Sequence, residues 1–167
     1  VVICGTRRPT PGHLFRSEDH GITWMDLGNI TGQGITCVAA GQGASAYALT
    51  EQSEFWVSRD RGKTWARTAT VSDGARTERR ALSYGIWLTE RGTLLVSDTH
   101  ASGGRVYRST DGGSTWTRID GISTLGLYRF NRVDAGVTVN GWAGAVYLSR
   151  DDGLTWTATQ VCDNPLY

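Results

Sequence analysis

The 167-residue chain has few cysteines, prolines and glutamates, and little net charge. Its three cysteines are Cys4, Cys37 and Cys162, an odd number without metal-ligand spacing, so we expect neither a metal site nor a disulfide-rich scaffold. No apolar run approaches the length of a membrane-spanning segment, so no membrane association is expected. A formal charge of +1 gives no strong positive field, so nucleic acid is not an expected partner.

A helical period is also missing, because no window repeats apolar residues every 3.6 positions. What the chain has instead is short runs of β-branched and aromatic residues separated by turns, with 22 glycines in all. Such runs are typical of β-strands joined by tight hairpins. The length suits one domain, and seven tryptophans and six tyrosines add apolar surface for a core. We therefore predict an all-β protein, as a single domain over residues 1–167.

One eight-residue pattern, Ser-x-Asp-x-Gly-x-Thr-Trp, occurs four times, and each copy is called a box below. The boxes span residues 17–24, 58–65, 109–116 and 149–156. Their aspartates are 41, 51 and 40 residues apart, and a period near forty indicates a repeat architecture. An aromatic residue always stands two positions before the box serine, so each box predicts a strand, a turn and a second strand.

The fixed box residues suit a turn. Glycine supplies a backbone conformation that a Cβ would resist, and serine and aspartate side chains accept hydrogen bonds from turn N–H groups. We expect threonine and tryptophan to start the outgoing strand, with the indole over the turn, so that outgoing strands span residues 64–68, 115–119 and 155–159. The residues expected in this structural role are Asp19, Asp60, Asp111, Asp151, Gly21, Gly62, Gly113, Gly153, Trp24, Trp65, Trp116 and Trp156.

These boxes resemble the Asp-box, or bacterial neuraminidase repeat, of sialidases, sortilin-type receptors, some glucanases, photosystem assembly factors and several lectins. The resemblance covers nearly the whole chain and implies a β-propeller of four-stranded blades. It is specific for the fold. It says little about function, because the family includes enzymes, receptors and binding proteins.

Four blades are expected, at about residues 1–30, 31–70, 80–122 and 123–162. The first is incomplete, because Val1–Gly5 aligns with the second strand of a blade. The two termini could complete it together, another copy of the chain could close it, or the chain could be part of a larger propeller. Closure by the termini would bring Cys4 near Cys162, either as a disulfide or as two isolated buried thiols, and Cys37 is expected to be a buried free thiol.

The resemblance implies that the end opposite the boxes carries ligands. In that set of loops arginine forks suit carboxylate or sulfate groups, and Trp142, in a glycine-rich turn, suits a sugar ring. A ten-residue insertion at residues 71–80 adds further arginines. The candidate ligand residues are Trp142, Arg7, Arg8, His100, Asp98, Arg76, Arg79 and Arg80. The alternative interpretation is that these are ordinary solvated loop residues.

The catalytic set that a resemblance to sialidases would imply is not recognisable. Such an enzyme needs an arginine triad, a Tyr–Glu nucleophile pair, an aspartate acid and, in most members, an Arg-Ile-Pro segment. Here Arg8-Pro9 lacks the isoleucine, and no Tyr–Glu pair stands out. Asp98 with Glu51 or Asp73 would supply two carboxylates, but nothing in the sequence selects them. No catalytic residue, metal or cofactor is therefore predicted.

The first hypothesis is a non-catalytic recognition module that binds a glycan or a protein partner through its loop face. The second is a small or partial glycoside hydrolase. The third is a structural assembly protein whose open sheet edges pair with neighbours, including further copies of itself. Relatives with similar repeats favour an extracellular, cell-surface or virion-associated setting.

Overall fold

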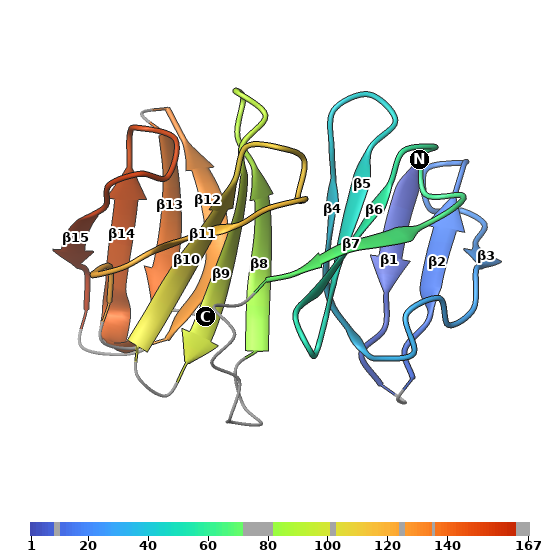
Figure 1. The fold of residues 1–167 in the computed structure, drawn as a ribbon, viewed down its shortest axis with the longest axis horizontal. Helices are drawn as coiled ribbons and strands as arrows, with labels where there is room; N and C mark the ends of the chain where they lie inside the picture. Colours follow the sequence, from blue (N-terminus) through green and yellow to red (C-terminus); the bar gives the residue numbers. More distant parts are fainter. Residues whose placement is uncertain (9–10, 72–81, 101–102, 124–125, 135, 163–167) are drawn as a thin grey trace. The chain divides into compact units, whose positions relative to one another are not determined.

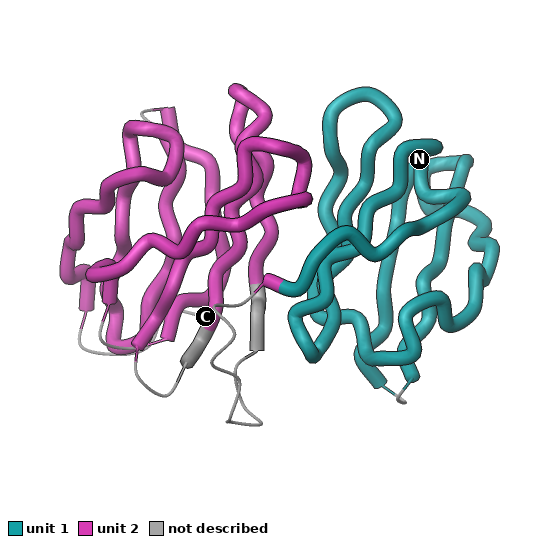
Figure 2. The backbone as a smooth tube through the Cα atoms, viewed as in Figure 1, with its two compact units in different colours: residues 1–70 teal, residues 71–167 magenta. Residues whose placement is uncertain are grey.

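The computed structural model describes residues 1–8, 11–71, 82–100, 103–123, 126–134 and 136–162, without the side chains of residues 82–84, 99 and 100. Its contacts divide the chain into two compact units, Val1–Thr70 and Val71–Tyr167 (Figure 2). They are called unit 1 and unit 2 below. All but one of the described regular elements are β-strands, joined into four antiparallel sheets (Figure 1).

Unit 1 holds a three-stranded and a four-stranded sheet. The first has the order β1 (Val2–Gly5), β2 (Leu14–Ser17) and β3 (Met25–Asp26). The second has the order β4 (Ile35–Ala40), β5 (Ala46–Thr50), β6 (Glu54–Ser58) and β7 (Ala66–Thr70). Sequence neighbours are therefore neighbours in each sheet, and each box is the turn between the last two strands.

Unit 2 holds two four-stranded sheets with the same up-and-down order. The first consists of β8 (Leu82–Leu88), β9 (Leu94–His100), β10 (Gly103–Ser109) and β11 (Thr117–Ile119). The second consists of β12 (Leu127–Val133), β13 (Gly136–Gly141), β14 (Ala145–Ser149) and β15 (Thr157–Gln160). A single 3₁₀ turn, η1 (Trp142–Gly144), joins β13 to β14.

The all-β architecture predicted from the sequence is confirmed, with the first sheet one strand short of the others. The predicted start of the outgoing strands was wrong. In all four boxes threonine and tryptophan precede the outgoing strand, which begins one residue after the tryptophan, as Ala66 does after Trp65. The reason is that the N–H of each box threonine is already used by the box aspartate, so it cannot enter the ladder.

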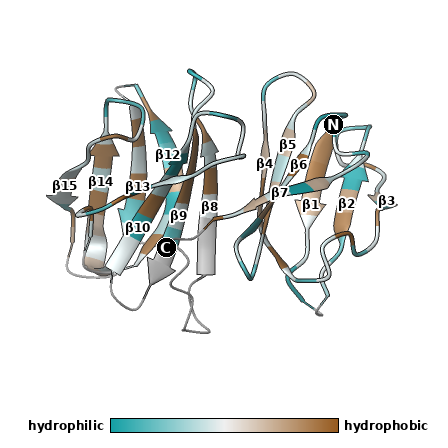
Figure 3. Ribbon diagram, viewed as in Figure 1, coloured by the Kyte–Doolittle hydropathy of each residue, from teal (hydrophilic) through white to brown (hydrophobic). Residues whose placement is uncertain are grey.

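Burial follows strand position within each sheet. The second strand β5 is buried throughout, whereas the outermost strands β7 and β15 are exposed at nearly every residue. Figure 3 shows apolar residues along β1 and β14. In unit 2, one buried cluster joins Leu95 of the first sheet to Phe130 and Val137 of the second, with Trp87 packed against it. In unit 1, the buried cluster of Leu14, Ile35 and Ala48 is smaller.

In each unit, the arginine that directly precedes the first box links the two sheets. Arg16 precedes the first box, and its Nε donates to the carbonyl oxygen of Arg61 in the second box at 2.7 Å. Arg108 precedes the third box, and its Nε donates to the carbonyl oxygen of Asp152 in the fourth box at 2.9 Å. Two equivalent side chains therefore hold the second box of each unit against the first sheet.

The cysteines depart from the expectation of buried thiols. Cys4 is exposed on β1, Cys37 and Cys162 are partly buried, and none of the three is in a disulfide. Cys4 is exposed because no further strand of the described residues lies beyond β1 in its sheet. No helix among the described residues has the length and apolar character needed to cross a membrane.

Candidate functional site

The box aspartates direct their carboxylates at their own turns. Asp19 accepts hydrogen bonds from the Ser17 hydroxyl at 2.7 Å, the Thr23 N–H at 2.9 Å and the Thr23 hydroxyl at 2.5 Å. The Trp24 indole N–H donates to the Gly21 carbonyl at 3.0 Å. The other three boxes repeat these bonds, with aspartates at Asp60, Asp111 and Asp151.

These bonds favour the charged form of each carboxyl. The hydroxyl and backbone N–H of the following threonine, with the serine hydroxyl, hold the pKa of Asp19, Asp60 and Asp111 far below the ordinary value of 3.8. Burial raises the pKa of Asp151, but bonds from Thr155 and Ser149 outweigh it and lower the pKa to about 2. The box carboxylates thus serve as acceptors for the backbone, and few lone pairs remain for a ligand.

Two consecutive residues of each box have left-handed backbone, where the sequence had indicated one. The box glycines have φ between 80 and 92°, and the residues before them have φ between 62 and 72°: His20, Arg61, Gly112 and Asp152. A non-glycine residue in this region is strained, and the aspartate bonds stabilise the turn against that strain. The first of the two positions is free in the pattern, so sequence reasoning had no reason to mark it.

The end of each sheet opposite the box holds the loops named as ligand candidates. Antiparallel order places the loop between the second and third strands at that end. In unit 1, Arg7 is already paired there, since its Nε lies 2.6 Å from Oε1 of Glu51 in the β5–β6 loop. Arg8 is exposed. Arg7 therefore joins two loops, and Arg8 extends into solvent.

In unit 2, Asp98 lies on β9 with 4% of its surface exposed, opposite Arg105 in the ladder. His100 is the last residue of β9, and its side chain is outside the described set. Arg76, Arg79 and Arg80 also lie outside the described residues. Burial leaves Asp98 little access to a bound molecule.

Trp142 is the most prominent of the predicted residues. It begins η1, with 44% of its surface exposed, and its backbone N–H donates to the Gly126 carbonyl at 2.9 Å. The next residue, Ala143, has φ 58°, so the turn is tight. The Tyr128 ring lies beside the indole, with centroids 6.0 Å apart and planes inclined by 32°. We call Trp142 and Tyr128 the aromatic pair.

The indole of Trp142 differs from the box indoles in its hydrogen bonding. Each box tryptophan donates its Nε1–H to the glycine carbonyl of its own turn. Among the described residues, the Trp142 indole nitrogen has no such acceptor. The aromatic pair therefore presents both an apolar face and a hydrogen-bond donor.

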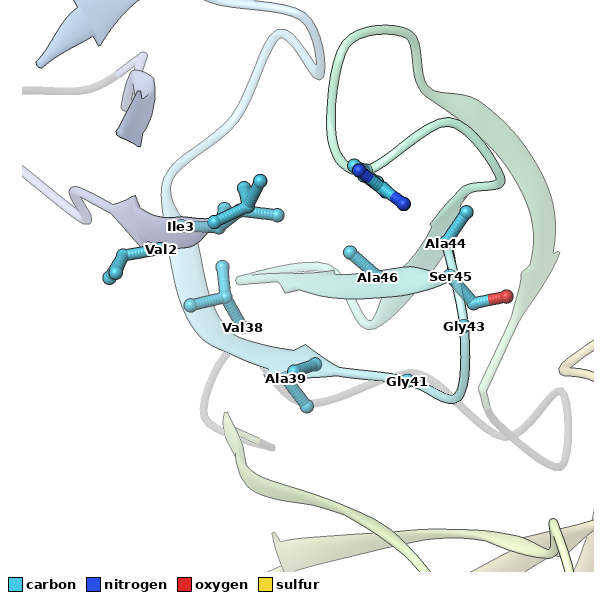
Figure 4. A pocket seen from close by; sticks show the side chains of 12 residues that line it. Val2, Ile3, Val38, Ala39, Gly41, Gly43, Ala44, Ser45 and Ala46 are labelled. Atoms are coloured by element: carbon cyan, nitrogen blue, oxygen red, sulfur yellow. The ribbon is translucent and has the colours of Figure 1, made fainter. Parts of the chain in front are cut away.

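Sequence reasoning missed two cavities at the box ends of the sheets. Cavity 1, in unit 1, has a volume of about 420 Å³ and is lined mostly by small and aliphatic residues, with polar and apolar atoms in about equal share. Figure 4 shows Ile3 of β1, Val38 of β4 and Ala46 of β5 around it, and Arg61 of the second box also lines it. The only sequence signal was the run of small residues between Ala39 and Ala46, where unit 2 has larger or charged ones.

Cavity 2, in unit 2, has a volume of about 510 Å³ and a charged rim. Its wall includes Trp87 and Leu88 at the end of β8, and its rim includes Glu90, Arg132 and Arg150. Glu90 and Arg132 form an ion pair, both largely exposed. No group of three or more histidine, cysteine, aspartate or glutamate side chains within the described residues is arranged to hold a metal ion.

The repeat, the sheets and the boxes agree with a comparison to known families. The family model of Sortilin-Vps10, described as sortilin, neurotensin receptor 3, matches residues 12–120, more than half of the chain. The chain belongs to the Sortilin-Vps10 family. The matched segment includes the first three boxes and reaches from unit 1 into unit 2.

Similarity to individual proteins is weaker. A xyloglucanase from a Paenibacillus species is 29% identical over 154 residues, which cover 74% of this chain and 15% of the relative. A protein of unknown function from Dyadobacter fermentans superposes with a TM-score of 0.64 at 17% identity, over 91% of this chain and 52% of that one. The GH74 enzyme of Niastella koreensis gives 0.62 at 18% identity, over 93% of this chain and 22% of that one.

These matches show a propeller-type fold. They also show that this chain spans only 15% of the length of its curated relative and about half, or less, of the solved structures named above.

Proposed function

We propose that this chain is a non-catalytic recognition module that binds a neutral glycan on the aromatic pair of unit 2. The observation that carries the proposal is the exposed Trp142 indole, held in place by a strained turn and by the Tyr128 ring. The C–H faces of a sugar ring pack on an indole, and the free Nε1–H can donate to a sugar hydroxyl. A rigid platform loses little side-chain entropy on binding.

Two further observations support this function. Of the two described carboxylates considered for catalysis, Asp98 is buried and Glu51 is paired with Arg7. The 29% identical relative is a xyloglucanase, so xyloglucan oligosaccharides are the first probe to use. Binding without hydrolysis fits the burial of Asp98 and the pairing of Glu51, because a glycosidase needs two accessible carboxyl groups.

The test is isothermal titration of xyloglucan oligosaccharides into the chain and its variants. We expect Trp142→Ala to weaken binding about tenfold or more, because one aromatic contact and one donor are lost. Tyr128→Leu should weaken it less, since this residue orients the indole. The matched control is Trp24→Ala: Trp24 is also 44% exposed, but its indole N–H is used within the first box.

Unchanged affinity in Trp142→Ala, or equal loss in Trp24→Ala, would contradict the proposal. The glycoside hydrolase alternative is tested in the same samples by analysing the oligosaccharides for cleavage. Turnover by the wild-type chain that Asp98→Asn abolishes would replace recognition by catalysis as its function.

A further inference from the structure

Cavity 2 lies between the two four-stranded sheets of unit 2, and the turn between β8 and β9 forms one of its walls. Within this turn the Thr89 N–H donates to the Thr93 carbonyl at 2.9 Å, and the Thr93 N–H donates to the Thr89 hydroxyl at 3.1 Å. The hydroxyls of both threonines also donate to the carboxylate of Asp152 in the fourth box. The two sheets are therefore held together beside the cavity, so a ligand would find its walls already in place.

One side of cavity 2 is apolar. Trp87 packs against the buried cluster that contains Phe130, which holds the indole in position. Trp87 and Leu88 are only partly buried, and Val133 is 37% exposed, so all three leave apolar surface to the cavity. A ring-sized apolar group placed on these side chains would remove that surface from water.

The other side of cavity 2 has more positive charge than it neutralises by itself. Its charged lining residues are Glu90, Arg91, Arg132, Asp134, Arg150 and Asp152. Glu90 pairs with Arg132, and Asp152 pairs with Arg108, which is not part of the lining. Within the described residues the side chains of Arg91 and Arg150 have no hydrogen bond or ion pair, and Asp134 is the one carboxylate left to balance them. One guanidinium charge therefore remains uncompensated.

We propose that cavity 2 binds a small organic anion in which a carboxylate is attached to an aromatic ring. The ring lies against Trp87, Leu88 and Val133, and the carboxylate accepts hydrogen bonds from Arg150. This arginine follows the buried Ser149 of a hydrogen-bonded box turn, so its backbone is fixed. A guanidinium matches a carboxylate in shape and charge, and the volume of about 510 Å³ is in the range of ligand pockets.

The site is separate from the aromatic pair and goes beyond the proposed glycan binding. Trp142 lies in the connection between β13 and β14, at the end of the sheet opposite the fourth box. A variant without glycan binding would keep cavity 2, and a chain that binds no anion would keep the aromatic pair. The two proposals can therefore fail independently.

The probe is naphthoate, titrated into the full chain at low salt and followed by NMR of the ligand. Naphthalene methanol presents the same ring without charge, and naphthylmethylamine presents it with a positive charge. We expect naphthoate to bind about fivefold more tightly than the alcohol and the amine to bind most weakly, because the lining arginines repel it. N-acetylphenylalaninate carries the same two groups as a peptide C-terminus. Tighter binding of this compound than of naphthoate would assign the site to a chain end, and weaker binding would assign it to a free aromatic acid.

Variants locate the anion in the cavity. Arg150→Gln should weaken naphthoate binding about fivefold and leave binding of the alcohol unchanged. The matched control is Arg59→Gln, at the same position of the second box and outside the lining of cavity 2. Glu90→Gln should strengthen naphthoate binding about twofold, because it releases Arg132 from its ion pair. Val133→Asp places a carboxylate on the exposed apolar side and should abolish binding without disturbing the core.

Three outcomes would overturn the proposal. The first is naphthoate binding no tighter than that of the alcohol, since the arginines would then take no part. The second is an equal loss in Arg150→Gln and Arg59→Gln, which would show a general attraction of anions to surface arginines. The third is binding that survives Val133→Asp, which would place the anion outside cavity 2.

Discussion

Units 1 and 2 link their sheets through residues at equivalent positions, but the aliphatic residue between the two sheets is buried to a different extent in each unit. Each uses an arginine before its first box, a box glycine in the second sheet and an aliphatic residue between them. In unit 2 the aliphatic residue, Leu95, is fully buried. In unit 1 it is Ile3, half-buried beside cavity 1. The local sequence pattern alone therefore does not determine burial. Two equivalent strands, β1 and β9, differ because β9 has a neighbouring strand on both sides and β1 on one side only.

The largest expected effect comes from alanine at the box glycines. A Cβ on Gly153 would lie 2.5 Å from Leu95, one on Gly62 would lie 2.6 Å from Ile3, and one on Gly21 would lie 3.6 Å from Trp24. All three glycines have left-handed φ, which costs alanine about 1–2 kcal/mol. We expect losses in the free energy of unfolding of about 3 kcal/mol for Gly153→Ala, about 2 kcal/mol for Gly62→Ala and about 1 kcal/mol for Gly21→Ala.

Urea denaturation followed by tryptophan fluorescence measures this series. Gly62→Ala should lose less than Gly153→Ala because Ile3 can shift into cavity 1, whereas Leu95 is fully buried and does not line either cavity. Equal losses at these two positions would show that the cavity gives Ile3 no such freedom.

A smaller effect is expected from removing the linking arginines. Arg108 donates to the carbonyl oxygen of Asp152 and pairs with its carboxylate at 3.1 Å, and both side chains are mostly buried. Arg16 instead pairs with Glu18, whose side chain is 67% exposed. We expect Arg108→Met to cost about 2 kcal/mol and Arg16→Met about 1 kcal/mol, because only the first leaves a buried carboxylate without its cation.

The same urea experiment measures both variants. Adding Asp152→Asn to Arg108→Met removes the buried carboxylate that has lost its cation, and should restore part of the lost free energy of unfolding. The absence of any restoration would mean that the carbonyl bond alone accounts for the link.

The smallest effect is the dependence of stability on pH through the boxes. The folded pKa of Asp151 is lowered from 3.8 to about 2, so the stability that it contributes is complete above pH 4 and is lost as the pH falls toward 2. Urea midpoints should therefore decrease between pH 4 and pH 2. Asp151→Asn should be less stable at pH 7 and should show a flatter profile over this range. A parallel profile would show that other carboxyls dominate.

Most of what could be predicted about local structure came from the four boxes. An aspartate, a glycine and a tryptophan at fixed spacing are enough to predict the turns, since each acts within eight residues. The start of the outgoing strands was misplaced because threonine has high β-propensity. That preference is overruled when the Thr23 N–H and its equivalents bond to the box aspartate. Propensity cannot show which acceptor a backbone N–H will find.

The candidate sites were less predictable. Exposure of Trp142 followed from its place in a glycine-rich turn, but its partner Tyr128 is fourteen residues earlier, on β12. Asp98 and Arg7 had the right chemistry for ligand binding, and the structure buries the first and pairs the second. Cavity 1 combines residues from β1, β4, β5 and the second box, which no single sequence window contains.

The amino-acid sequence by itself determined the number of turns, the order of strands and the all-β class, because these depend on interactions between residues close along the chain. The tertiary structure decided which equivalent strand is covered, which arginine is paired and where space remains. Those outcomes depend on side chains brought together from different sheets, and identical local patterns meet different neighbours there.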